Sequence, residues 1–148
     1  MADAAAIIHE IETSYTAYNA AFLREDIPGV VRYVTAPYVM NIGGNPPRIS
    51  QTPEDVLQNF NASLAGMKKS GWQRSDTKIV KIWPFSNNHG LLMADIVRYK
   101  TDGTILNKGR YCYSMRRAGE LWQICAVTDV GEAFAGPGAG DIARLYKA

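Results

Sequence analysis

Four tyrosines are the side chains of this sequence whose type and spacing could support chemistry. Tyr15 and Tyr18 lie three residues apart in a stretch with helical periodicity, so they share one face of the expected helix. Tyr111 and Tyr113 lie two residues apart in an expected strand, so they share one face of a sheet. A buried hydroxyl needs a hydrogen-bond partner, and four phenols around one apolar space are more than a core needs. A ligand carbonyl or an ordered water could be that partner; the alternative is that Tyr15 and Tyr18 only fill the core.

The other reactive side chains do not form a catalytic or metal-binding group. His9 lies off the apolar stripe of the first helix and His89 lies in the turn NNHG, so we expect both to be exposed. Cys112 and Cys125 are expected to be buried free thiols that face each other, with a redox pair as the alternative. No His, Cys, Asp or Glu residues have metal-ligand spacing, and GPGAG lacks the Lys-Ser/Thr of a phosphate loop. We expect neither a metal nor a cofactor.

Two helices are expected at the start of the chain. Residues 4–23 have an apolar residue at every third or fourth position, which predicts an amphipathic helix. Its apolar stripe consists of Ile8, Ile11, Tyr15, Tyr18 and Phe22. A short second helix should follow Asp26 as its N-cap, carry Pro28 in its first turn and end at Pro37.

The segment TPED predicts the start of a third helix. Thr52 would be its N-cap, Pro53 its first residue and Asp55 the acidic residue of a capping box. Between the second and third helices we expect a strand over 38–42 and a loop over 43–50.

The second half of the chain predicts a four-stranded antiparallel meander. Its expected strands cover 76–84, 91–100, 105–117 and 121–129. Asp102-Gly103 and Ala118-Gly119 are the expected hairpin turns. The order helix, helix, strand, helix and meander predicts an α+β fold, with the helices on one face of a curved, mostly antiparallel sheet.

Two-residue hairpin turns would give the meander one apolar and aromatic face, which we expect to meet the helices. This face would contain Leu92, Ala94, Ile96, Tyr111, Tyr113, Met115, Trp122, Ile124, Ala126 and Thr128. The opposite face is mixed, with Asp95 and Arg110 as a cross-strand ion pair. Its many apolar groups favour a homodimer through this outer face. A register error of one residue would exchange the two faces.

The size and charge of the chain favour a single cytoplasmic domain. It has 148 residues and a net charge of +2, with no basic cluster that would favour nucleic acid. No stretch approaches the ~18 apolar residues of a membrane helix, and the first residues lack the pattern of a signal peptide. We expect a domain over 1–130 and a flexible Gly/Ala/Pro-rich tail with a short helix over 131–148.

Two segments match the opening and the closing hairpin of a known superfamily. YNAAFLREDIPGVVRYVTAPYVM has an aromatic helix, an acidic start to the second helix and an aromatic before the first strand. MRRAGELWQICAV has the pattern R-x-x-G-x-W-x-I. The chain thus resembles the nuclear transport factor 2-like (NTF2-like) superfamily, within it the SnoaL-like and ketosteroid-isomerase-like branch. The resemblance implies a cone-shaped fold, in which three N-terminal helices and a curved sheet surround an apolar pocket. Many members are dimers through the outer sheet face.

The resemblance also implies catalytic residues. Tyr18 falls where the steroid isomerases have a tyrosine that donates to the developing enolate, and Tyr111 best matches their second donor. Asn41 falls where they have an aspartate base, and an amide cannot take a proton from carbon. Strand alternation leaves open whether Asn41 or Met40 points into the pocket.

Further pocket residues follow from the face assignment and the resemblance together. The residues expected to contact a ligand are Tyr15, Tyr113, Met115 and Trp122. Ala126 and Thr128 occupy places where many SnoaL-like members carry histidines. Glu12, at the edge of the first helix's stripe, is the nearest carboxylate that could turn inward.

Three functions remain open at this stage. The chain could bind a small hydrophobic, carbonyl-bearing molecule without chemistry, through Tyr18, Asn41 and Tyr111. It could be an isomerase, cyclase or dehydratase that uses tyrosines as hydrogen-bond donors and an unassigned base. It could also be an interaction module whose pocket is filled by its own side chains. The sequence identifies neither the ligand nor the reaction.

Overall fold

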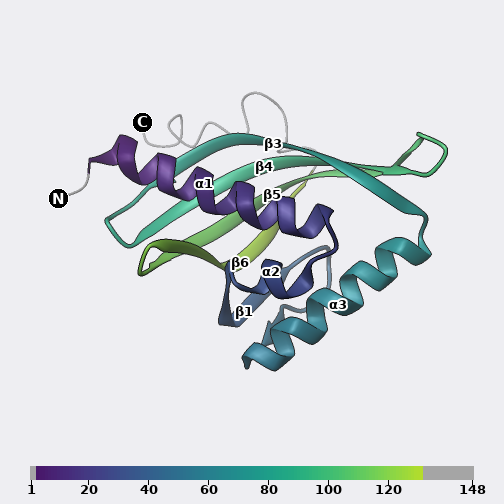
Figure 1. Ribbon diagram of the computed structural model, residues 1–148, viewed down its shortest axis with the longest axis horizontal. Helices are drawn as coiled ribbons and strands as arrows, with labels where there is room; N and C mark the ends of the chain where they lie inside the picture. Colours follow the sequence, from purple (N-terminus) through teal and green to yellow (C-terminus); the bar gives the residue numbers. More distant parts are fainter. Residues whose placement is uncertain (1–2, 132–148) are drawn as a thin grey trace.

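The computed structural model describes residues 3–131, which form three helices and one six-stranded sheet (Figure 1). The elements are α1 (Ala4–Leu23), α2 (Ile27–Val31), β1 (Val34–Asn41), β2 (Arg48–Ser50), α3 (Pro53–Lys69), β3 (Trp72–Pro84), β4 (His89–Lys100), β5 (Ile105–Ala118) and β6 (Leu121–Val130). The α+β class with helices packed on a curved, unclosed sheet is therefore confirmed.

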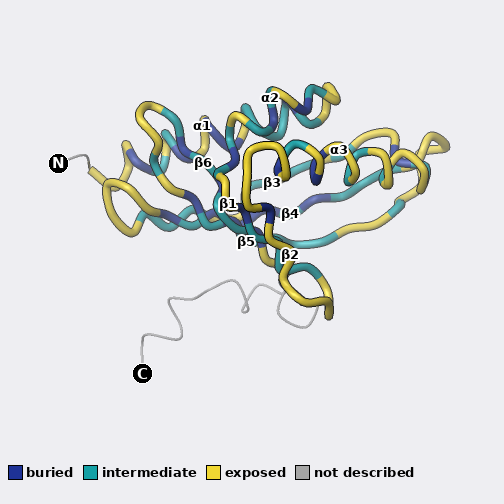
Figure 2. Tube along the Cα trace, turned by 90° about the horizontal axis from the view of Figure 1, so that it is seen from below, coloured by how far each residue is buried: buried dark blue, intermediate teal, exposed yellow. Residues whose placement is uncertain are grey.

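The sheet has the strand order β2-β1-β6-β5-β4-β3. The strands β3 to β6 form the expected antiparallel meander. The first strand, β1, lies parallel to β6 and antiparallel to the short edge strand β2. All three helices lie on the same side of this sheet, and the buried residues gather between the two layers (Figure 2). That arrangement leaves the other sheet face without a helix from the described residues.

The helix starts follow their capping residues. In α2 the Asp26 carboxylate accepts a hydrogen bond from the backbone N–H of Gly29, at 3.0 Å. In α3 the Thr52 hydroxyl accepts from the N–H of Asp55, and the Asp55 carboxylate accepts in return from the N–H of Thr52, both at 3.1 Å. These reciprocal bonds confirm the capping box, which satisfies two backbone donors that a helix start otherwise leaves open.

The segment around Pro37 differs from the prediction. The second helix ends at Val31, and β1 already begins at Val34, so Pro37 lies inside a strand instead of ending a helix. The pairing of β1 with β6 is interrupted between Val34 and Val39. A proline fits there because it has no N–H to give to a ladder. The expected loop over 43–50 also contains the edge strand β2.

The two hairpins of the meander differ in how well their register was predicted. Between β4 and β5 the expected pairs Leu92–Tyr113 and Ala94–Tyr111 are confirmed. Between β5 and β6 the turn is Gly119-Glu120, one residue later than expected, because Ala118 pairs with Leu121. Gly119 has a φ of +63°, which a glycine adopts at no steric cost.

A register shift at Cys125 then changes which residues of β6 point inward. Met115 pairs with Ile124, but Ser114 pairs with Ala126, so Cys125 is an extra residue on β6. Beyond it Tyr113 faces Val127 and Tyr111 faces Asp129. The expected inward positions Ala126 and Thr128 were therefore wrong, because a single inserted residue exchanges the two faces of a strand.

The later turn and this shift together separate the two cysteines. Cys112 pairs with Thr128, so the expectation that Cys112 and Cys125 face each other was wrong. Both are free, partly buried thiols, and Cys125 donates a hydrogen bond to the carbonyl oxygen of Ser114, at 3.2 Å. Burial raises the pKa of both thiols.

The outer sheet face carries the expected ion pair. The Arg110 guanidinium donates to both carboxylate oxygens of Asp95, at 2.6 and 3.0 Å. This bidentate pair holds the pKa of Asp95 below its usual value. It confirms that the two residues form a cross-strand pair on the face opposite the helices.

The two remaining expectations from the sequence concern the C-terminal tail and a possible membrane helix. The tail with a short helix, expected over 131–148, lies outside the described residues apart from residue 131. Among the residues that the structure describes, no helix has the length and apolar character needed to cross a membrane.

Candidate active site

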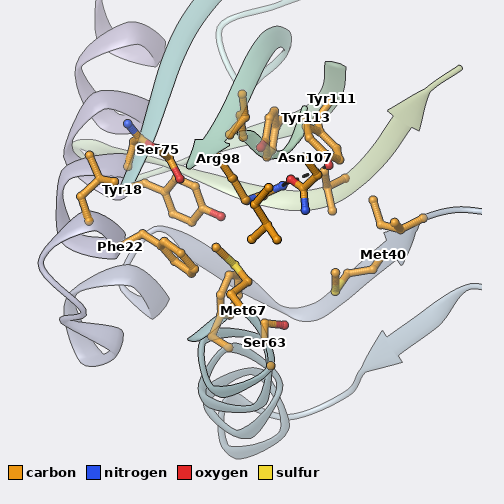
Figure 3. Close-up of a pocket in the computed structure, with 18 of the residues that line it drawn as sticks. Tyr18, Phe22, Met40, Ser63, Met67, Ser75, Arg98, Asn107, Tyr111 and Tyr113 are labelled. Atoms are coloured by element: carbon orange, nitrogen blue, oxygen red, sulfur yellow. Dashed lines mark hydrogen bonds between the residues drawn. The ribbon is translucent and has the colours of Figure 1, made fainter. Parts of the chain in front are cut away.

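A cavity of about 430 Å³ lies between α1, α3 and the helix-facing side of the sheet. Helix α1 contributes Tyr15, Tyr18 and Phe22 to it, and α3 contributes Ser63 and Met67. The walls from the sheet come from β1, β3, β4, β5 and β6. Figure 3 shows the labelled side chains converging on one space from both layers of the fold.

All four tyrosines singled out in the sequence line this cavity. The rings of Tyr15 and Tyr113 meet edge to face with their centroids 5.0 Å apart, and those of Tyr15 and Tyr18 are 5.7 Å apart. The Tyr18 hydroxyl points into the cavity (Figure 3). Tyr15 is 1% exposed, and its hydroxyl forms no hydrogen bond of normal geometry among the described residues. Burial raises the pKa of Tyr15, and the Tyr113 hydroxyl is near enough to offset part of that rise but does not meet that geometry. A buried hydroxyl without a partner is costly, which favours a site that is completed by another molecule.

The structure places Asn41 outside the cavity. Met40 and Val127 are neighbours on β1 and β6 and both line it. Asn41 is the next residue along β1, so it points to the other face, where its amide donates to the Thr128 hydroxyl at 3.5 Å. The prediction that Asn41 belongs to the site is thus not supported by the geometry, because strand alternation turns Met40 inward instead.

Met115 and Trp122 also lie away from the cavity. They are 2% and 0% exposed, in the core beneath the first half of α1. The indole N–H of Trp122 donates to the Glu10 carboxylate at 3.0 Å, and its backbone N–H donates to the Ser14 hydroxyl at 3.0 Å. These bonds fix the start of α1 on β6, so both residues support the fold and do not contact the cavity, contrary to prediction.

Arg98 is the charged residue of this site that the sequence did not lead us to predict. It lines the cavity from β4, and its Nη1 donates to the Asn107 side-chain oxygen at 3.1 Å and to the Tyr111 hydroxyl at 3.4 Å. Ala94 and Ile96 were placed on the inward face, and the same alternation extends to Arg98 two residues later. The signal was therefore present in the sequence, one step beyond the assigned face.

A glycine allows Tyr111 to lie beside Arg98. A β-carbon at Gly109 would come within 3.0 Å of the Tyr111 hydroxyl oxygen and 3.1 Å of two ring carbons. Because Gly109 has no side chain, the Tyr111 ring folds back over it, with the Arg98 guanidinium carbon 5.7 Å from the ring centroid. The ring and the guanidinium are thus held together by strand geometry and a cation–π contact.

A family model described as "NTF2-like protein (DUF6841)" matches residues 9–132. The chain belongs to this NTF2-like family. The match covers every described residue that lines the cavity, from Tyr15 in α1 to Val127 in β6. A search of curated proteins finds no match.

Solved structures with the same fold support the assignment. A ketosteroid isomerase-like protein from Erwinia carotovora atroseptica has a TM-score of 0.61 and 16% identity, over 84% of this chain and 96% of that one. An NTF2-like protein from Shewanella oneidensis gives 0.62 and 12%, over 82% and 96%. A protein with a cystatin-like fold from Nostoc punctiforme gives 0.64 and 12%, over 81% and 86%. At these identities the likeness shows the fold alone.

The cavity of this NTF2-like domain offers hydrogen-bond donors and one cation. Desolvation raises the pKa of Tyr15, Tyr18 and Tyr113, and the charge of Arg98 only partly offsets it. The phenols therefore stay protonated at neutral pH and can donate hydrogen bonds. Among the described residues that line the cavity there is no Asp, Glu, His or Cys.

The described acids and histidines that could have served as a base do not line the cavity. Glu12, His9 and His89 are exposed, as expected for both histidines and contrary to the inward alternative for Glu12. Asp129 faces Tyr111 across β5 and β6, but it is exposed and accepts a hydrogen bond from the backbone N–H of Gly43, at 2.9 Å. It therefore holds the loop after β1 and does not line the cavity.

Proposed function

We propose that this NTF2-like domain binds a small, largely apolar molecule that carries a carbonyl oxygen, in the cavity between α1, α3 and the sheet. The observation that carries the proposal is the Tyr15 hydroxyl, which is buried beside the cavity without a partner among the described residues. Tyr18 directs a second hydroxyl into the same space (Figure 3). A volume of about 430 Å³ lies within the range of small-molecule sites.

Binding without proton abstraction fits this lining better than steroid-isomerase chemistry. Such chemistry needs a base within reach of the substrate carbon, and the lining residues described here include none. An isomerase, cyclase or dehydratase would have to take its base from the ligand, from water or from outside this lining. In that case Tyr18 and Tyr111 would stabilise a developing oxyanion, a role that can contribute roughly 3–4 kcal/mol per donor.

The first test is native mass spectrometry of the protein purified from its own host. A co-purifying small molecule with a carbonyl group is the expected result. Its dissociation constant should rise by about 2- to 12-fold in Tyr18→Phe, since a neutral hydrogen bond contributes about 0.5–1.5 kcal/mol. Tyr99→Phe is the matched control, because Tyr99 lies on β4 outside the cavity and contacts Arg74. Equal affinity of all three proteins would count against the proposal.

A homodimer through the outer sheet face is a second proposal, and it concerns a different surface. None of the described helices covers this face (Figure 2), and Ile49 on the edge strand β2 is 52% exposed next to Val39. Sedimentation velocity at micromolar concentration should show a dimer that Ile49→Lys weakens. Ile105→Lys is the matched control, because Ile105 is 55% exposed at the far end of the β4–β5 hairpin. A wild-type protein that sediments only as a monomer would refute this proposal.

A further inference from the structure

We propose that Arg98 selects monocarboxylates, so that the pocket holds a small apolar acid whose two carboxylate oxygens accept hydrogen bonds from Nε and Nη2 of Arg98. This inference deepens the function proposed above and rests on it. It replaces a general carbonyl group by a specific anionic one.

Arg98 has N–H donors without a partner among the described residues. A guanidinium has five N–H donors in a planar fork. Its two hydrogen bonds within the described part of the chain both start from Nη1, toward Asn107 and Tyr111. Figure 3 shows the side chain extending across the cavity toward these two residues. The fork is therefore fixed in place, while the edge formed by Nε and Nη2 has the geometry that binds a carboxylate through two parallel bonds.

Arg98 has no carboxylate partner among the described residues. On the outer face Arg110 donates to both oxygens of Asp95. Arg117 likewise pairs with Glu10 at 2.6 Å. None of the ion pairs among the described residues includes Arg98. Arg98 is partly buried in a largely apolar lining, so an anionic ligand would offset the partial desolvation of its charge.

The lining of the cavity restricts the charge and the chemical character of the ligand. Arg98 is the only charged side chain among the described residues that line the cavity. One positive charge balances a monoanion, whereas a phosphate monoester would bring a second, unbalanced negative charge. The remaining walls include Phe22, Met40 and Met67, which offer apolar contact to a hydrocarbon or aromatic body. A monocarboxylate with an apolar body satisfies both parts of the site.

The experiment compares acids with their uncharged primary amides by isothermal titration calorimetry. The probes are octanoate and octanamide, and 4-phenylbutanoate and 4-phenylbutanamide. We expect each acid to bind about 10- to 100-fold more tightly than its amide, as for hydrogen bonds to a charged group. Arg98→Gln should remove this preference, because the acid loses a charge-assisted hydrogen bond and the amide only a weaker one. Arg116→Gln, which removes an exposed arginine on β5, should keep the preference.

The outcomes separate this inference from the proposed function. If acids and amides bind wild type equally, the role of Arg98 is refuted while the pocket remains a binding site. If Arg98→Gln retains the preference, the inference is also refuted. If none of the four probes binds, the carboxylate inference is refuted, whereas the proposed function is decided by whether a carbonyl-bearing molecule co-purifies with the protein. Should Arg98→Gln fail to fold, the Nε–H resonance of Arg98 in wild type gives the decision, because it should shift with octanoate and not with octanamide.

Discussion

The contact between Gly90 and Ile11 fixes where α1 lies on the sheet, and it can be tested by one added methyl group. A β-carbon at Gly90 would lie 2.6 Å from the Ile11 Cδ1 atom and 3.1 Å from the Trp83 carbonyl oxygen. Ile11 is 0% exposed, so its side chain has no room to move away without disturbing the core. Gly90→Ala should therefore strain the interface between α1 and β4.

The size of the effect follows from two opposing terms. Overpacking a core costs about 1–3 kcal/mol, and the lower chain entropy of alanine in the unfolded state returns about 0.5–1 kcal/mol. From the central values of the two terms we expect the free energy of unfolding of Gly90→Ala to fall by about 1 kcal/mol. Gly66→Ala is the matched control, because Gly66 lies in α3 with nothing within 4 Å of the added carbon. It should instead stabilise the protein by about 0.5–1 kcal/mol.

The assay is urea unfolding monitored by circular dichroism, with a double-mutant cycle. Ile11→Val alone should cost about 0.5–1.5 kcal/mol, but it also removes the Cδ1 atom that the new methyl group meets. The double variant should therefore be no less stable than Ile11→Val, which gives a coupling of about 1 kcal/mol. Strictly additive losses, or a Gly90→Ala protein as stable as wild type, would refute the assigned contact.

Three further predictions concern the fold around the site. Trp122 and Arg117 hold the pKa of Glu10 below 4.5. Wild type should therefore have a larger free energy of unfolding than Glu10→Gln above about pH 4.5, and this difference should vanish as the pH falls through the lowered pKa. Urea unfolding at several pH values measures the difference, and a difference that does not change with pH would contradict the prediction. Thr52→Ala should lower the free energy of unfolding by about 1 kcal/mol, whereas Thr13→Ala, within α1, should not. Cys112 should react slowly with thiol reagents below pH 9, because burial raises its pKa. It should form no disulfide with Cys125 on mild oxidation, because it faces Thr128. Mass spectrometry of the oxidised protein checks this.

Much of the fold was predictable because its signals are local. The apolar spacing of 4–23 and the capping box at Thr52 each lie within a few residues, and the structure places helices at both. The pairs between β4 and β5 up to Arg98 also followed from alternation and one turn, whereas at the tip Tyr99 pairs with Ile105, one residue off the expected register. The NTF2-like assignment used the same elements in order, and the family match confirms it.

The rest depends on irregularities that leave no local mark. The alternation of apolar and polar residues in β6 does not predict that Cys125 is an extra residue, because Ala126 and Val127 are both apolar and either could face the core. Pro37 similarly suggested a helix end, while the interrupted pairing of β1 with β6 accommodates it within a strand. Such features arise from how strands meet across the sheet, and a single sequence does not specify that meeting.

The shift at Cys125 also decides what kind of chemistry the pocket can support. It turns Val127, an apolar side chain, into the cavity and moves Thr128 to the other face, beside Asn41. The next inward residue, Asp129, accepts its hydrogen bond from Gly43 at the rim. Both strands that could have supplied a proton acceptor thus present apolar groups, Met40 and Val127, to the cavity. What remains inside are phenols that stay protonated and a fixed guanidinium, a set of donors suited to holding an oxygen-bearing ligand and not to removing its protons.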